Sequence, residues 1–211
     1  MRSGIKFSEG YFNPFSEMAK FYYGKNLDRY IQQLRLNKEP GAAYQYQSAN
    51  SQILAMILER TSGKSLPEFL QEKIWEQAGM QYDASWNLDS EKHGSVKAFC
   101  CLNARALDFA RFARLYSREG YYRDKEIIPS SWISKTFKNT TDSKDAEGYP
   151  YHFMWRVIDG DILFAKGILG QYIYIDRSRD LIIVRFGKKN KKVRWVELFK
   201  EIGAGFDSQS R

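Results

Sequence analysis

The sequence is poor in the residues that most metal sites and histidine-based catalytic sites need. It has only two histidines, His93 and His152, and its two cysteines, Cys100 and Cys101, are adjacent. No Cys-x-x-Cys pair or Cys/His cluster is present to hold zinc. Neighbouring cysteines rarely pair, so we expect two small buried thiols and no disulfide. The sequence therefore offers little material for a His-dependent triad, and it predicts neither a metal nor a cofactor.

Long apolar runs are also missing. No stretch approaches the roughly 18–20 residues that span a bilayer. The N-terminus has no charged start followed by an apolar stretch and a small-residue cleavage site, so we expect no signal peptide. The chain is then either cytoplasmic or a piece whose targeting segment is missing. A hydrophobic content of 43% and an aromatic content of 16% predict a folded globule.

The net charge is +8, and much of it comes from the run GKKNKKVRW, which includes Lys188 and Arg194. Such a run could contact nucleic acid or anionic lipid. The aromatic residues do not gather among these lysines into a stacking platform. We therefore favour a solvated turn between a strand and a last helix, and we expect no nucleic-acid partner.

Residues 1–148 have mainly helical periodicity. Two short helices are expected within 15–37, with a break near Gly24. A helix should run from Ser48 to Arg60, and a second should begin at Ser65 with Glu68 completing a capping box and continue to about residue 80. Further helices are expected within 103–120 and 129–137. In the first of these two, Asp108 and Arg111 are one turn apart and predict a surface ion pair.

Residues 149–187 change to alternating and β-branched patterns, which predict three or four antiparallel strands. Asp159-Gly160 is typical of a hairpin turn. A terminal helix is expected within 190–203. The order of elements, helices first and strands last, indicates an α+β fold in a single domain over 1–211.

Three segments together resemble the serine β-lactamase-related family, which includes class C β-lactamases, penicillin-binding-type peptidases, and many esterases and amidases. The segments read PGAAYQYQSANSQILAMILERTSGKSLPEFLQEKIWEQAGM, AFCCLNARALDFARFARLYSREGYYRDKEIIPSSW and FAKGILGQYIYIDRSRDLIIVRFG. The resemblance runs in order from about residue 1 to 203. It implies part of a β-lactamase/transpeptidase-like fold, an incomplete domain whose missing strands leave an unpaired sheet edge.

The family's second motif, Tyr-x-Asn or Tyr-x-Ser, corresponds here to Tyr46 and Ser48. In the family this tyrosine works with the lysine of a Ser-x-x-Lys motif to move the proton of the nucleophilic serine. The resemblance implies that role for Tyr46, and for Ser48 a role in orienting substrate or lysine. A phenol with a pKa near 10 needs a neighbouring ammonium to act as a base near neutrality.

The family's third motif is Lys or His, a small residue and Gly, on a strand that lines the site. Gly167 matches the glycine, but Ala165 stands where the cation belongs. Strand side chains alternate between faces, so Lys166 should point away from that position and be solvated or packed on the sheet. The Ile168 N–H is a candidate oxyanion donor, and Gly167 to Gly170 would shape the substrate side. Loss of the cation weakens the case for carboxylate recognition more than that for ester or amide cleavage.

The sequence contains one Ser-x-x-Lys, at Ser3 and Lys6. A catalytic pair of this kind lies on a buried helix, whereas this one has Gly4 after the serine and lies at a chain end. Within the family, MRSGI resembles the segment that follows the nucleophile helix. We therefore interpret Ser3 as an accident of spacing and expect the true nucleophile upstream of Met1.

Two functions remain open. The first is a β-lactamase-related serine hydrolase acting on an ester, amide or peptide-like bond, here a fragment without its nucleophile. The second is a non-catalytic binding module on the same scaffold. The expected partners are a small-molecule or peptide-like substrate and a second copy or a missing N-terminal segment. A bacterial periplasm or cell envelope is suggested by the family alone.

Overall fold

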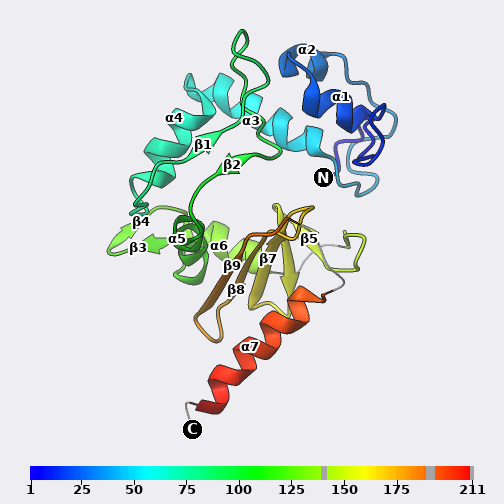
Figure 1. Ribbon diagram of the computed structural model, residues 1–211. Coiled ribbons are helices and arrows are strands. Elements are labelled where there is room, and N and C mark those ends of the chain that lie inside the picture. Colours follow the sequence, from blue (N-terminus) through cyan, green and yellow to red (C-terminus); the bar gives the residue numbers. More distant parts are fainter. Residues whose placement is uncertain (139–141, 189–192, 210–211) are drawn as a thin grey trace. The chain divides into compact units, whose positions relative to one another are not determined.

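The computed structural model describes residues 1–138, 142–188 and 193–209 of the chain. The chain divides into two compact units (Figure 1). Unit 1 contains Met1–Glu72 and Asp83–Asn103, and unit 2 contains Lys73–Tyr82 and Ala104–Arg211. The single domain expected over 1–211 stays a prediction.

Unit 1 is mainly helical, as the sequence predicts. Its helices are α1 (Glu17–Tyr23), α2 (Leu27–Gln32), α3 (Ser48–Ser62) and α4 (Leu66–Leu70). The predicted break at Gly24 separates α1 from α2, and each of these helices begins at a side-chain cap. Ser16 accepts the Ala19 N–H, and Asn26 accepts the Arg29 N–H.

The connection between the units departs from the expected single helix. The predicted capping box of Ser65 and Glu68 is present at the start of α4. The α-helix then gives way after five residues to a π-helix, η1 (Gln71–Trp75). A π-helix shifts the hydrogen-bond partner by one residue and leaves the apolar spacing nearly unchanged, so periodicity does not reveal it.

The two cysteines form a disulfide with each other, so the prediction of free thiols was wrong. Both are half-buried, not buried. Cys101 has a left-handed backbone conformation, φ 71°. Residues other than glycine rarely adopt it, so the expectation that neighbouring cysteines do not pair leaves it out. The two cysteines directly precede β2 (Leu102–Asn103), which forms a short antiparallel pair with β1 (Ser85–Trp86).

Unit 2 is built around one antiparallel sheet in the order β5-β6-β7-β8-β9. The strands are β5 (Tyr151–His152), β6 (Trp155–Ile158), β7 (Ile162–Lys166), β8 (Tyr172–Asp176) and β9 (Leu181–Arg185). Asp159 and Gly160, at φ 52° and 76°, form the predicted turn between β6 and β7. The strand region is thus confirmed, with two-residue β5 as an addition.

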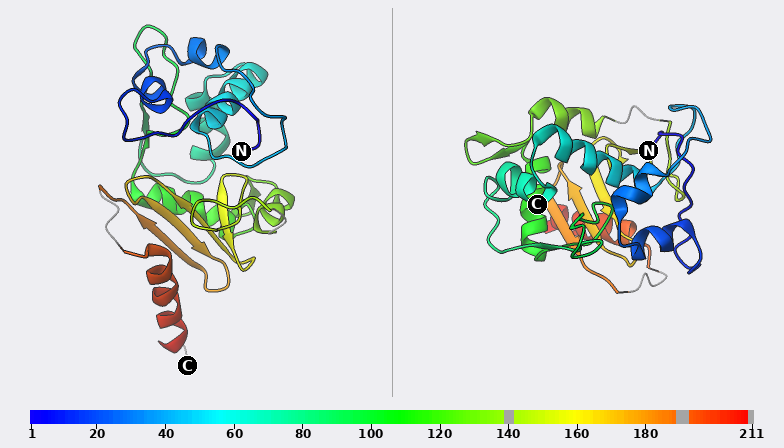
Figure 2. Two further views of the ribbon diagram at one scale, coloured as in Figure 1. Left: turned by 90° about the vertical axis from the view of Figure 1, so that its right-hand side faces the viewer. Right: turned by 90° about the horizontal axis from the view of Figure 1, so that it is seen from above.

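Helices cover both faces of this sheet (Figure 2). They are α5 (Ala106–Ser117), α6 (Ser130–Phe137) and α7 (Trp195–Gln209), and a hairpin of β3 (Tyr121–Tyr122) and β4 (Lys125–Glu126) lies between α5 and α6 in the chain. Leu163 packs with residues of α5 and α6, and its neighbour Phe164 packs with residues of α7. This alternation fixes the register, because a slip of one residue would exchange the two faces.

Asp108 is completely buried, so the predicted surface ion pair was wrong in its setting. Its carboxylate accepts hydrogen bonds from the Arg111 side chain at 2.8 Å and from the Gln81 N–H at 2.9 Å. Spacing along a helix predicts the pair but not the neighbouring segment that covers it. Most of the basic run around 188–194 lies outside the described residues.

No helix within residues 1–138, 142–188 and 193–209 is long and apolar enough to cross a membrane.

Candidate active site

The predicted Tyr46 and Ser48 lie at the beginning of α3, in unit 1. Ser48 is the first residue of the helix, and Gln47, the N-cap residue, makes no side-chain capping bond. The buried Gln47 side chain instead donates to the carbonyls of Ile5 at 2.8 Å and Phe7 at 3.2 Å. These bonds fix the start of α3 against the N-terminal segment of the chain.

Glu9 takes over the capping role that Gln47 leaves open. Its carboxylate accepts the Ser48 backbone N–H and, at 2.9 Å, the Ser48 hydroxyl. A carboxylate at this place satisfies one of the unpaired N–H groups of the first turn and interacts favourably with the positive end of the helix dipole. Glu9 therefore fixes the Ser48 side chain in one orientation.

Tyr11 completes the cluster. Its hydroxyl donates to the Glu9 carboxylate and lies 3.4 Å from the Ser48 hydroxyl oxygen. Burial raises the pKa of Tyr11 most, the hydrogen bond to Glu9 raises it further, and the nearby Tyr46 adds to the same direction. Tyr11 thus remains a protonated phenol near neutral pH and acts as a hydrogen-bond donor, not as a base.

Tyr46 has 40% of its surface exposed. Its ring is therefore not sealed inside hydrocarbon, and a reacting group can approach it from solvent. Tyr46, Ser48, Glu9 and Tyr11 together form what we call the α3 cluster: a hydroxyl held by a carboxylate and a phenol, with the exposed Tyr46 near that phenol.

Gly167 and Gly170 lie in the turn between β7 and β8, in unit 2. The Gly167 N–H donates to the Gln171 carbonyl at 2.8 Å, and the Gly170 N–H donates to the Gly167 carbonyl at 3.0 Å. A Cβ on Gly167 would lie 2.7 Å from the Gln171 amide oxygen, and Gly170 has φ 82°. Position 170 thus favours glycine for its backbone conformation, whereas a Cβ at Gly167 would require the flexible Gln171 side chain to shift.

The Ile168 N–H lies between these glycines and donates to no acceptor among the described residues. Half of the Ile168 residue surface is exposed. The group is available to a developing oxyanion, and that role stays a prediction.

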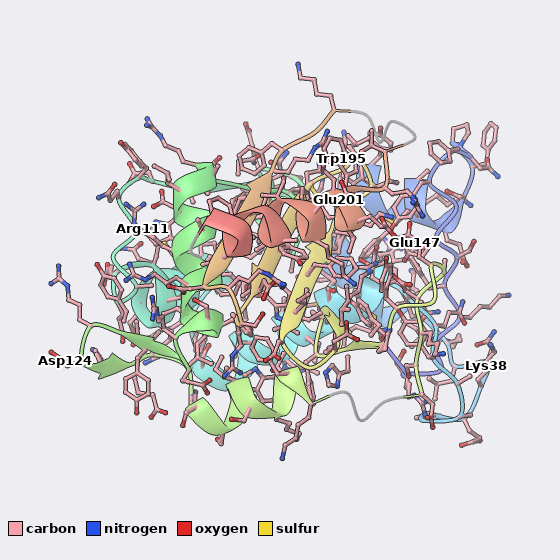
Figure 3. The ribbon with its side chains drawn as sticks, turned by 90° about the horizontal axis from the view of Figure 1, so that it is seen from below. Lys38, Arg111, Asp124, Glu147, Trp195 and Glu201 are labelled. Atoms are coloured by element: carbon pink, nitrogen blue, oxygen red, sulfur yellow. A yellow bond between two sulfur atoms is a disulfide. The ribbon has the colours of Figure 1, made fainter. Side chains whose placement is uncertain are left out.

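Lys166 belongs to the opposite face of the sheet from Ala165. Ala165 packs with residues of α5 and α6, whereas Lys166 pairs with Tyr172, which packs with residues of α7. The Lys166 ammonium forms an ion pair with Glu147, which is labelled beside α7 in Figure 3. The Lys166 side chain therefore points away from the Ala165 face and is ion-paired there, as the alternation of strand side chains predicts.

Ser3 and Lys6 do not lie on a helix. The Ser3 hydroxyl accepts the Ile5 N–H at 3.4 Å, and the Lys6 N–H donates to the Arg35 carbonyl at 2.7 Å. Without a helical turn between them, serine and lysine lack the shared face that the catalytic pair requires.

The predicted site residues therefore fall into two groups, one in each unit. The structure joins Ser48 to Glu9 and Tyr11, which sequence reasoning missed, and it places Tyr46 close enough to Tyr11 to affect that phenol's pKa. One signal in the sequence could have indicated Glu9. The residue before α3 is Gln47, a poor N-cap, so the acceptor for the N–H groups of the first helical turn is expected from elsewhere in the chain. Among the described residues, no group of three or more His, Cys, Asp or Glu side chains is placed to hold a metal.

Comparison with known proteins assigns the chain to a family. The chain belongs to the Beta-lactamase family, whose model matches residues 1–202. This confirms the resemblance that the three sequence segments indicated.

Among curated proteins the chain is similar to the 6-aminohexanoate-dimer hydrolase of Paenarthrobacter ureafaciens. The two are 25% identical over 205 residues, which cover 88% of this chain and 52% of that protein. The chain thus spans about half the length of this curated relative.

Solved structures agree on the fold. The putative 6-aminohexanoate-dimer hydrolase from Bacillus anthracis superposes with a TM-score of 0.82 at 25% identity, covering 99% of this chain and 60% of that chain. A penicillin-binding protein from Bacillus halodurans superposes with a TM-score of 0.65 at 16% identity, covering 95% of this chain and 69% of that chain. The mixed helical and antiparallel fold of this chain is therefore β-lactamase/transpeptidase-like, as the sequence predicted.

Proposed function

We propose that this chain carries part of the active site of a serine hydrolase that cleaves an amide, ester or peptide-like bond through an acyl-enzyme. The curated relative is named for hydrolysis of a 6-aminohexanoate dimer, which supports a linear amide as the substrate class. In the reaction, a serine oxygen adds to the substrate carbonyl carbon, and its proton passes by way of Tyr46 to the departing amine or alcohol. Water then cleaves the serine ester and releases the acid.

The α3 cluster is the observation that carries this proposal. The Ser48 hydroxyl donates its only hydrogen to Glu9. The lone pairs of the Ser48 oxygen are then left to accept a hydrogen bond from a lysine ammonium or a substrate N–H. An ammonium at that place would also lower the pKa of the Tyr46 phenol, which is the condition for base catalysis near neutrality.

The nucleophile in this proposal comes from residues outside these 211. Ser3 is the alternative within the chain, and its geometry does not support it. The chain alone should therefore show no burst of product with an activated ester such as p-nitrophenyl acetate. Residual turnover would come from binding and hydrogen-bond donors only.

The experiment begins with the coding DNA upstream of Met1. An in-frame Ser-x-x-Lys there supports the hydrolase, and the extended protein is then expressed and assayed with p-nitrophenyl acetate and a linear amide. Expected are burst kinetics that disappear when the serine of that upstream motif is replaced by alanine. A promoter and start site directly before Met1, with no burst from the chain, would contradict the proposal.

The second candidate is a binding module without catalysis. The geometry of Ser3 and Lys6 favours it, because neither residue lies on a helix and the pair therefore lacks the shared face of a catalytic serine and lysine. Such a module would bind a peptide-like or amide ligand without cleaving it. Equilibrium dialysis against the linear amide, followed by analysis of the ligand for hydrolysis, separates the two functions.

A further inference from the structure

An open hollow of about 870 Å³ lies within unit 2, between the end of α5 and the β3–β4 hairpin. Three arginines and two tyrosines line it: Arg114, Arg118, Arg123, Tyr121 and Tyr122. Figure 3 shows the hairpin at the side of unit 2, with the turn residue Asp124 labelled. None of these lining residues belongs to the motifs of the proposed active site.

The positive charge in the hollow is not fully compensated by the protein. Arg118 forms an ion pair with Asp180, and the lining residue Glu119 forms one with Arg177. Arg114 and Arg123 form no ion pair with any described residue. Arg114 lies in the last turn of α5, where a cation also suits the helix dipole, but that explanation does not extend to Arg123 in the hairpin turn.

The loop that carries Arg123 adopts its conformation at a cost. Glu119 and Arg123 have positive φ angles, 51° and 53°, which cost about 1 kcal/mol or more for residues other than glycine. Between them, Gly120 lies so close to Ile128 that a Cβ would come within 1.8 Å of its carbonyl oxygen. Tight packing therefore determines this loop, and such strain is found most often at ligand sites.

We propose that this hollow binds a small molecule that carries a phosphate group. Two unpaired guanidinium groups match a doubly charged phosphate better than a singly charged carboxylate, and each can donate two parallel hydrogen bonds to its oxygens. The exposed Tyr121 ring offers a face on which a flat group of the ligand can stack. The Arg123 guanidinium, 5.5 Å from the Tyr122 ring centre, is already oriented over the hollow's wall.

Isothermal titration of the full 211-residue chain with sodium pyrophosphate tests the proposal. Saturable binding of one pyrophosphate per chain is expected, and the double variant Arg114→Gln, Arg123→Gln should bind at least about tenfold more weakly. Lys125→Gln is the matched control, since Lys125 is exposed on the same hairpin and does not line the hollow. Its loss of affinity should stay within about threefold.

Two further titrations distinguish the source of the phosphate. Acetate should bind at least about tenfold more weakly than pyrophosphate. Vesicles of phosphatidylcholine with phosphatidic acid should not bind more tightly than pyrophosphate does. The proposal is overturned by absent saturation, by equal losses in the Lys125→Gln and double variants, or by binding to the vesicles alone. The test uses no hydrolysis, so its result is independent of the proposed enzymatic activity.

Discussion

The Glu9 carboxylate accepts both the backbone N–H and the side-chain hydroxyl of Ser48. The two residues are far apart in the sequence, yet this contact starts α3 and orients the Ser48 hydroxyl. Tyr11 donates to the same carboxylate. The Glu9 side chain therefore organises the α3 cluster, and the proposed function requires that it keep these hydrogen bonds to Ser48 and Tyr11.

Replacing Glu9 by glutamine should lower the free energy of unfolding of unit 1 by about 1–2 kcal/mol, because the charged acceptor at the start of α3 is lost. Urea unfolding followed by circular dichroism measures the change, and amide exchange at Ser48 should accelerate. Glu39→Gln is the control, since Glu39 is exposed and its side chain forms no hydrogen bond or ion pair with any described residue. Equal stability of both variants would show that Glu9 does not cap the helix.

Tyr174 should make stability fall at high pH. Its side chain is completely buried, and burial, followed by the neighbouring Asp176, raises its pKa from 10.0 to about 12. Above pH 10 the unfolded chain releases this proton while the folded chain retains it, so folding stability is lost as the pH rises towards 12. The loss from this residue should reach about 2 kcal/mol at pH 12.

The variant Tyr174→Phe should remove that part of the pH dependence. The Tyr174 hydroxyl is buried and bonds to no described residue, so its removal should leave stability at pH 7 unchanged or slightly higher. Tyr23→Phe, at a position with 78% exposure, is the matched control. Urea unfolding at pH 9 and pH 11 measures both, and parallel losses in wild type and Tyr174→Phe would refute the assignment.

Ser3→Ala should change neither the reaction with p-nitrophenyl acetate nor the unfolding midpoint. Ser3 makes one weak local hydrogen bond and has no lysine on a shared helical face. Stopped-flow absorbance at the p-nitrophenolate band measures any burst. A burst in the unmodified chain that Ser3→Ala abolishes would make Ser3 the nucleophile after all.

The chain should self-associate through the edge of its sheet. Among the described residues β9 pairs only with β8, so one side of the strand presents unpaired backbone groups. Phe186, which follows β9, is 54% exposed. Sedimentation velocity from about 5 to 100 μM should show species larger than a monomer. A monodisperse monomer that unfolds cooperatively would count against this prediction.

Local signals predicted the parts of the fold that depend on local physics. The cap at Ser65, the break at Gly24 and the Asp159-Gly160 turn each follow from the conformational preferences of a few neighbouring residues. The alternation that places Lys166 away from Ala165 follows from strand geometry alone. The family resemblance alone pointed to Tyr46 and Ser48, and their roles stay predictions.

What the sequence did not predict depends on contacts between distant segments or on unusual backbone. Glu9 reaches Ser48 only because the N-terminal segment lies against the start of α3. Asp108 is buried because the segment around Gln81 covers it. The Cys100–Cys101 disulfide accompanies a left-handed residue that no local pattern indicates.

The most direct test of the account is the variant Tyr46→Phe in a protein extended upstream to the proposed Ser-x-x-Lys. Loss of the phenol should lower kcat for a linear amide about 100-fold or more, while the unfolding midpoint stays unchanged. Tyr44→Phe, two residues earlier, is the control and should retain most of the activity. Full activity of Tyr46→Phe would contradict the central claim that this phenol moves the proton in catalysis.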